Sequence, residues 1–404
     1  MRNRSKIFAA ALLGASLGIV AGGAAYAAAP AASGTEQVPT FKVDPEWPKQ
    51  LPNNWIFGVI GAIFVDKADH VWIAQRPAST TTLGYRDLMQ GAGECCTPAP
   101  PVLELDPQGN VLRTWGEIHI TDPESKKEVP IGKQVSPPYP EGLWPPNEHA
   151  IYIDYKDNVW LSSSNAPSQL VKFTRDGKFL MRIGKEEAKS VNDKMNLAGT
   201  AAVYVDPKSN EVFVADGYRN RRVIVFDADT GAYKRHWGAY GKPPQDPQSS
   251  RPDPDMKKRA QQFELVHCLM ASNDGFLYVC DRANSRIQIF KKDGTFVREA
   301  FITADGSPPH ATGLGTAMAV AFSPDPEQKY LYYLDAPDKK VLILRRSDMK
   351  VLGSFGGGGR NAGQFITPHA ISVDSKGNIY VGGTVTDDRI QKFNFTGMQT
   401  VSVK

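Results

Sequence analysis

Three of the seven histidines occupy the same place in three copies of a repeated sequence unit. His149, His267 and His369 each open a predicted strand and lie eleven residues before the aromatic residue of the next strand. A single histidine in such a place is usually just a hydrogen-bonded polar residue. Three in one register are hard to assign to packing. Catalytic zinc takes three protein ligands and keeps a fourth position for water or substrate, so the trio predicts a shared metal site.

Two arginines and a tyrosine fall where the following strand ends. Arg76 and Arg282 lie four residues after the second-strand aromatic of their repeats, and Tyr218 directly follows Gly217, which has that place in another repeat. An arginine at a strand end is often only a surface ion pair. Here the shared position predicts two guanidinium groups and a phenol around the metal, with no carboxylate.

This set of side chains has a specific chemistry. A guanidinium binds a carboxylate bidentately. A phenol beside a second guanidinium and a dication is expected to have a lowered pKa and to act as a base. The absence of an Asp or Glu base argues against an ordinary zinc hydrolase.

The elements that must position these residues are copies of one unit of four strands. The clearest copy spans Gln262–Phe296, with hairpin signals at Asn273-Asp274-Gly275 and Lys292-Asp293-Gly294. The first strands of the six copies begin at Gly61, His149, Ala201, His267, Met318 and His369. Six such units predict an all-β fold, a six-bladed β-propeller that forms one domain over residues 30–404. Because the histidines open alternate blades, they are expected to point at the central axis with threefold symmetry.

The ends of the repeat array predict how the ring closes. The sixth copy stops after its third strand, Ile390–Asn394, and only a weak fourth strand follows in Gly397–Lys404. An orphan extended segment, Thr40–Val43, is therefore predicted to complete the outer edge of the last blade. Three insertions rich in proline and charge, Pro77–Pro101, Glu117–Asn147 and Ala239–Phe263, are expected to be surface loops.

The N-terminus and the composition limit location and partners. Residues 1–29 resemble a secretory signal peptide, with Arg2, Arg4 and Lys6 before a short apolar run, so we expect export to the periplasm or medium. No segment is predicted to span a membrane. A net charge of +4 without a basic run makes nucleic acid an unexpected partner.

The four cysteines leave their pairing open. Cys95 and Cys96 are adjacent in an insertion, and Cys268 and Cys280 lie nearly opposite each other across a hairpin turn. The latter pair is compatible with a cross-strand disulfide in an oxidising compartment and equally with two buried thiols.

The chain resembles the peptidyl-α-hydroxyglycine α-amidating lyase family, whose fold is a six-bladed propeller of NHL-type repeats. The likeness is most specific over residues 212–238 and 263–290 and at Pro368-His369. The resemblance implies that His149, His267 and His369 bind zinc, that Tyr218 and Arg282 are catalytic, and that Arg76 holds the substrate carboxylate.

The activity implied by the resemblance is carbon–nitrogen lysis. That family cleaves the N–Cα bond of a C-terminal α-hydroxyglycine and releases an amide and glyoxylate, so the expected substrate is a peptide or small molecule with a C-terminal carboxylate. The sequence departs from the family at Thr367, usually Met, and at Ala370, usually an Asp that helps to bind calcium. Calcium is therefore less expected than zinc.

Two other functions are compatible with a propeller. One is a non-catalytic NHL-propeller binding module in which the metal is structural. The other is an SMP-30-type lactonase, which needs a Glu/Asn/Asp cluster around calcium on the axis, whereas the inner positions here hold His, Gly, Ala and Met.

Overall fold

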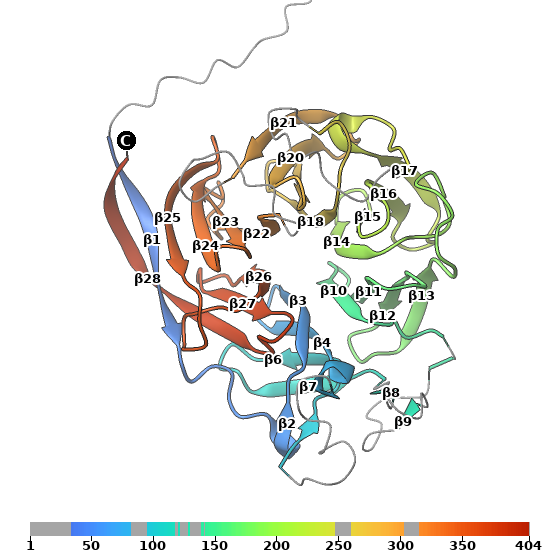
Figure 1. Ribbon diagram of the computed structural model, residues 1–404, viewed down its shortest axis with the longest axis horizontal. Coiled ribbons are helices and arrows are strands. Elements are labelled where there is room, and N and C mark those ends of the chain that lie inside the picture. The colour runs from blue at the N-terminus through green and yellow to red at the C-terminus, as the bar shows by residue number, and fades with distance from the viewer. Residues whose placement is uncertain are drawn as a thin grey trace, which may run out of the picture.

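A computed structural model describes residues 34–81, 95–117, 120–121, 128–129, 139–140, 142–246, 260–302 and 315–403. The chain forms six four-stranded antiparallel sheets arranged as blades around a central axis (Figure 1). The prediction of an all-β, six-bladed β-propeller is confirmed. The predicted signal peptide lies outside the described residues and stays a prediction. Within the described residues, no helix has the length and apolar character needed to cross a membrane.

In the first five blades the four strands follow one another along the chain, except that the first insertion separates the second and third strands of blade one. Blade one has β3 (Val59–Val65), β4 (Val71–Arg76), β6 (Val102–Leu105) and β7 (Val111–Trp115). Blade two has β10 (Glu148–Ile153), β11 (Val159–Ser163), β12 (Leu170–Phe173) and β13 (Phe179–Ile183). Blade three has β14 (Thr200–Asp206), β15 (Glu211–Asp216), β16 (Arg222–Asp227) and β17 (Tyr233–Trp237). Blade four has β18 (Val266–Ala271), β19 (Phe276–Asp281), β20 (Arg286–Lys291) and β21 (Phe296–Phe301). Blade five has β22 (Ala317–Phe322), β23 (Tyr330–Asp335), β24 (Lys340–Arg345) and β25 (Lys350–Gly356).

The sixth blade joins the two ends of the chain. Its strand order is β1-β28-β27-β26, with β1 (Gly34–Asp44) outermost, then β28 (Ile390–Val403), β27 (Ile379–Gly383) and β26 (Pro368–Val373) (Figure 1). The prediction that an N-terminal segment completes this blade is confirmed. The weak fourth strand predicted at Gly397–Lys404 is wrong, because those residues up to Val403 continue β28. Thr396 is left without a partner where the register against β1 shifts, and Gly397 beside it has a φ of 120°, so this point is a bulge rather than a turn.

All three insertions leave their blades at the same end of the propeller. The first insertion begins with a 3₁₀ turn, Pro77–Thr81, and ends in β5 (Thr97–Pro98), which pairs with β2 (Trp55–Ile56). The second holds the short strands β8 (Ile120–Thr121) and β9 (Glu128–Val129), and the third begins with a 3₁₀ turn, Ala239–Gly241. Within these insertions, residues 82–94, 118–119, 122–127, 130–138, 141 and 247–259 lie outside the described residues.

The core lies between neighbouring blades and fixes the inner strands. The second strand of each blade is buried on both faces, and its aromatic residue is at most 2% exposed; these residues are Trp72, Trp160, Phe213, Tyr278, Tyr332 and Tyr380. Burying an aromatic side chain stabilises a fold by roughly 1.5–3 kcal/mol. Because each first strand begins where the second strand ends, the six inner positions and the second-strand termini share one mouth of the ring.

Candidate metal centre

Each of the six inner positions is a β-bulge. In blade two, Glu148 pairs with Ser163 and Ala150 pairs with Ser162, so His149 is left without a partner across the strands. The same register shift occurs in the other blades at Gly61, Ala201, His267, Met318 and His369. A bulge bends the strand and re-aims the extra residue, which turns these side chains from the sheet face toward the axis.

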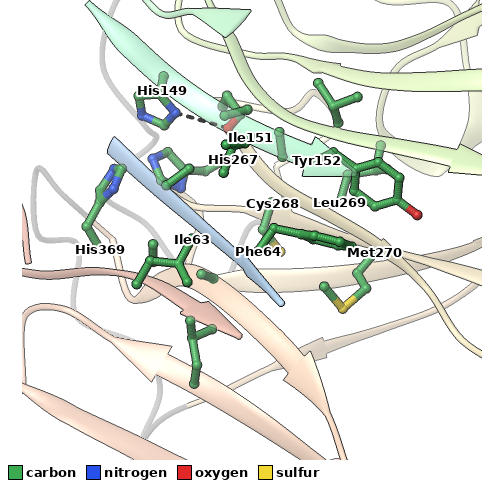
Figure 2. Close-up of a pocket in the computed structure, with 18 of the residues that line it drawn as sticks. Ile63, Phe64, His149, Ile151, Tyr152, His267, Cys268, Leu269, Met270 and His369 are labelled. Atoms are coloured by element: carbon green, nitrogen blue, oxygen red, sulfur yellow. Dashed lines mark hydrogen bonds between the residues drawn. The ribbon is translucent and has the colours of Figure 1, made fainter. Parts of the chain in front are cut away.

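The three histidines meet at the axis. Their ring centroids are 5.1 Å apart for His149 and His267, 4.8 Å for His149 and His369, and 5.1 Å for His267 and His369. One ring nitrogen from each lies within 4.8 Å of the others, and all three residues are buried. Figure 2 shows the rings pointing toward one another at one end of an apolar cavity. The predicted convergence of the three imidazoles is confirmed.

Backbone carbonyls of the neighbouring blade hold the rings. His149 Nδ1 donates to Ala201 O at 3.0 Å, and His267 Nδ1 donates to Met318 O at 2.7 Å. His369 Nδ1 has no partner that meets hydrogen-bond geometry, although the proximity of the Gly61 backbone raises the pKa of this ring. Since a carbonyl only accepts, Nδ1 of His149 and His267 carries the proton and Nε2 is left as the metal-binding atom.

The imidazoles are neutral at physiological pH. Burial is the main cause that lowers the pKa of all three, and the charge of Arg76 adds to it in each case. For His369 these effects lower the pKa to about 3. Neutral imidazole is the form that binds metal ions.

The phenol of Tyr218 caps this group. Its hydroxyl lies 2.6 Å from His149 Nε2 and 3.1 Å from His267 Nε2. A phenol has one proton, so it can satisfy only one of two Nε2 lone pairs. The site thus has more acceptors than donors, and a cation bound by the three nitrogens would satisfy the excess. The residues fit a divalent metal ion.

Two glycines make room for Tyr218. A Cβ on Gly199, whose φ is +92°, would lie 2.4 Å from Tyr218 Cβ, and one on Gly217 would lie 2.1 Å from Val266 O. The Tyr218 amide donates to Gly199 O at 3.0 Å. The short β15–β16 connection therefore places the phenol over the histidines through close backbone approach.

The electrostatics of Tyr218 differ in part from the prediction. The charges of Arg282 and Arg76 lower its pKa, as expected, but burial raises it more, and the net direction is upward. The protein charges alone therefore do not make Tyr218 an anion at neutral pH. The positive charge of a bound ion would act in the same direction as the two guanidinium groups.

The structure brings both predicted arginines to the site. The guanidinium of Arg282 lies 5.9 Å from the Tyr218 ring centroid, and its Nη1 is 4.0 Å from Met318 Sδ. Arg76 donates from Nε to Glu148 O at 2.8 Å. Burial lowers the pKa of Arg76, while Tyr218 and Glu148 raise it.

Sequence reasoning missed the residues that hold Arg76. Glu148 is buried beside His149 and accepts a hydrogen bond from Trp144 Nε1 at 2.7 Å. Gln75 is fully buried and bonds Gly58 N and Ala99 O, which ties the first insertion to the end of β4. Gly61 allows this arrangement, because a Cβ there would lie 2.2 Å from Glu148 O. Adjacency to His149 and Arg76 in the sequence was the only available signal.

A second cluster of possible ligands is already filled. Asp66, His70 and Glu104 have ligand atoms within 4.8 Å of one another. The guanidinium of Arg175 bonds Asp66 Oδ2 at 2.8 Å and contacts Glu104 Oε1. His70 is partly buried, with its Nδ1 2.8 Å from Glu104 Oε1, and an arginine occupies the place of a cation.

The axial cavity beyond the histidines has a volume of about 110 Å³. Its lining includes Phe64, Tyr152, Met270 and Ala370, and none of the described residues that line it carries a carboxylate (Figure 2). Calcium prefers carboxylate and other oxygen ligands, so this cavity does not fit it well.

The chain is similar in sequence to peptidyl-glycine α-amidating monooxygenases. The Xenopus laevis B form is 29% identical over 261 residues, which cover 63% of this chain and 27% of that protein. The Rattus norvegicus protein is 28% identical over 262 residues, covering 63% of this chain and 24% of the relative. The chain thus matches about a quarter of the length of these relatives. No family model matches.

Solved structures give a looser likeness. A streptogramin B lyase aligns with a TM-score of 0.47 and 12% identity over 90% of this chain and 98% of that one. A virginiamycin B lyase from Staphylococcus aureus aligns with a TM-score of 0.44 and 12% identity over 89% of each chain.

Proposed function

We propose that this protein is a carbon–nitrogen lyase that cleaves the N–Cα bond of an α-hydroxyglycine-type amide and releases glyoxylate and an amide. Zinc would be held by His149, His267 and His369. The observation that carries the proposal is the hydroxyl of Tyr218 within hydrogen-bond distance of two metal-binding nitrogens, with a guanidinium behind its ring. The similarity to enzymes named for peptidyl-glycine α-amidation supports a reaction that yields an amide.

Each side chain would have one task. The bound ion supplies a positive charge that polarises a substrate oxygen. Tyr218, ionised to the phenolate under the added charge of the ion, would accept the proton of the substrate hydroxyl, and the O–H electron pair would form the carbonyl of glyoxylate. The N–Cα bond breaks, its electrons go to the amide nitrogen, and that nitrogen takes a proton back from Tyr218. Arg282 stabilises the phenolate through its charge.

Arg76 would bind the substrate carboxylate. Its Nε is used on Glu148 O, so its two terminal nitrogens form the edge that faces a ligand. A guanidinium binds a carboxylate through two parallel hydrogen bonds, which fixes the orientation of the α-carbon. The expected substrate is therefore a peptide or N-acyl compound that ends in a carboxylate.

The test is glyoxylate release from an N-acyl-α-hydroxyglycine by the zinc-loaded protein. Tyr218→Phe should keep its zinc and lose roughly 10²–10⁴-fold in kcat, the usual contribution of a general base. The matched control is Tyr155→Phe, since Tyr155 is 42% exposed and its hydroxyl donates to Asn210 Oδ1 on the surface at 2.8 Å, and this variant should react like the wild type. Undiminished release by Tyr218→Phe would contradict the assigned role.

The same assay decides between the alternatives. A folded, zinc-loaded wild type that releases no glyoxylate would favour a binding module with a structural metal. No observation favours a lactonase, because the described residues that line the axis supply no Glu/Asn/Asp cluster.

A further inference from the structure

One disulfide lies beside the metal centre. Cys268 and Cys280 are bonded, are directly opposite each other in the β18–β19 pair, and have Cα atoms 4.8 Å apart. Cys268 follows the metal-binding residue His267, and Cys280 precedes Arg282 by two positions. The bond therefore links the strand that carries a histidine to the strand that carries an arginine, next to the bulge that aims His267 at the axis.

The other blades show that a blade does not need this bond. The equivalent pairs beside the bulge are uncharged residues without a covalent link: Ala62 and Ala74, Ala150 and Ser162, Ala202 and Ala215, Ala319 and Leu334, and Ala370 and Gly382. Blade four differs from these five because it supplies both a histidine and an arginine to the centre. The disulfide occurs where two functional side chains of one blade must keep a fixed separation.

Few groups hold the side chain of Arg282. Its Nε is buried without a hydrogen-bond partner, its Nη1 lies 4.0 Å from the weak acceptor Met318 Sδ, and its remaining partner is the phenol of Tyr218. The nearby Arg286 is fixed by Asp281 at 2.8 Å and by Glu299 at 3.2 Å. Besides its contact with Tyr218, the position of the Arg282 guanidinium depends on its backbone, which is anchored by a hydrogen bond from its amide to Leu265 O and by the disulfide two residues earlier.

We propose that the Cys268–Cys280 disulfide positions His267 and Arg282 relative to each other, so that metal affinity and the charge beside Tyr218 depend on the bonded pair. The cysteines are positioning residues, since neither is assigned a contact with metal or substrate. The part that concerns Arg282 rests on the proposed lyase function. The part that concerns metal affinity does not.

The test replaces the disulfide with a pair that the fold already uses. Cys268→Ala with Cys280→Ala recreates the alanine pair of blades one and three. Zinc affinity is measured by competition with a chromophoric chelator, at a temperature where circular dichroism shows every variant folded. We expect about tenfold weaker zinc binding, the lower end of the effect of removing an outer support of a metal ligand. We also expect kcat for glyoxylate release to fall more than KM changes.

The control removes the other disulfide. Cys95 and Cys96 are bonded to each other in the first insertion, and Cys95→Ala with Cys96→Ala should leave zinc affinity unchanged. Unchanged zinc affinity and kcat in the Cys268/Cys280 variant, with only a lower Tm, would overturn the proposal and leave a purely stabilising bond. If that variant does not fold, the same titration on native protein reduced with a phosphine and alkylated decides in the same way. A wild type that binds zinc but releases no glyoxylate would contradict the lyase function. The comparison of zinc affinity between the wild type and the Cys268/Cys280 variant would still test the role of the disulfide.

Discussion

At the scale of single residues, two kinds of blade contribute differently to the candidate metal centre. Blades two, four and six supply the imidazoles, while the backbone of blades three and five accepts the Nδ1 protons of His149 and His267. Burial then keeps the rings neutral. The histidine side chains therefore provide the candidate ligands, and the backbone of the neighbouring blades orients them.

The neutral histidines predict a pH dependence of stability. Their folded pKa values lie below the 6.5 of an unfolded histidine, so below about pH 6.5 the unfolded chain binds up to three more protons than the folded one. The free energy of unfolding of the metal-free protein should therefore fall as the pH falls, by up to about 4 kcal/mol per pH unit from this group.

Urea denaturation between pH 8 and pH 5 measures this effect. His149→Gln removes one titrating ring and should reduce the slope by about a third, which separates the histidines from other titrating groups. A variant with the same slope as the wild type would show that the imidazoles are not buried as neutral groups.

A buried carboxylate in blade five predicts the opposite pH dependence. In blades three and four the equivalent aspartates are paired with Arg222 and Arg286, but Asp335 Oδ2 is buried without a partner. Burial raises the pKa of Asp335 to about 6, above its unfolded value of 3.8. Between these values the folded state binds the extra proton, so stability from this group is lost as the pH rises through 6.

Asp335→Asn should therefore stabilise the protein above pH 6, by up to about 3 kcal/mol, and give no gain near pH 4. Thermal unfolding at both pH values measures the difference. An equal change in Tm at the two pH values would contradict the assignment.

At the scale of elements, the sequence shows the register of the inner strands but not their bulges. The repeat shows His149, His267 and His369 at equivalent positions, because the residue type at each position can be read directly from the sequence. Backbone atoms, which every residue has, leave no such signal in the sequence. They form the bulge, the carbonyl acceptors of Ala201 and Met318, and the Glu148 carbonyl that binds Arg76. The upward shift that burial gives the pKa of Tyr218 in the metal-free protein is also invisible in the sequence, since a strand-end motif does not show how deeply a side chain is buried.

A substitution at Gly61 tests whether the Glu148 carbonyl positions Arg76. A Cβ at Gly61 would meet Glu148 O at 2.2 Å, so Gly61→Ala must displace the carbonyl that accepts the Arg76 Nε bond. We expect KM for a carboxylate substrate to rise at least tenfold, with a smaller change in kcat. Gly353→Ala is the control, because a Cβ there meets only Val38 Cγ1 at 3.5 Å. A KM unchanged by Gly61→Ala would contradict a role for Arg76 in binding the substrate carboxylate.

At the scale of the whole molecule, self-similarity predicts the ring and most of its closure. Alternating apolar strands and Asp-Gly turns recur often enough to count the blades and to leave one missing edge for an N-terminal strand. The length of the β1–β28 ribbon was not predictable, because Gly397 is as compatible with a turn as with a bulge. Both cysteine pairs form disulfides, which the spacing of the cysteines alone did not decide.

The ribbon that closes the ring predicts a stability effect. Phe41 on β1 packs against Tyr332, Phe355 and Phe395, with ring centroids 5.6, 5.1 and 6.1 Å away. Phe41→Ala should lower the free energy of unfolding by about 3 kcal/mol, the low end for losing a phenylalanine, since Phe41 is only partly buried. Urea denaturation measures it against Leu112→Ala, a residue that is 50% exposed. Equal stability of the two variants would show that β1 does not seal the last blade.

The most direct test of the whole account is zinc stoichiometry by mass spectrometry on the purified, folded protein. The account predicts one zinc per chain in the wild type and almost none in His149→Ala with His267→Ala, because one remaining imidazole cannot hold the ion. Zinc retained by the folded double variant, or a folded wild type that takes up no zinc, would contradict a metal centre built from alternate blades.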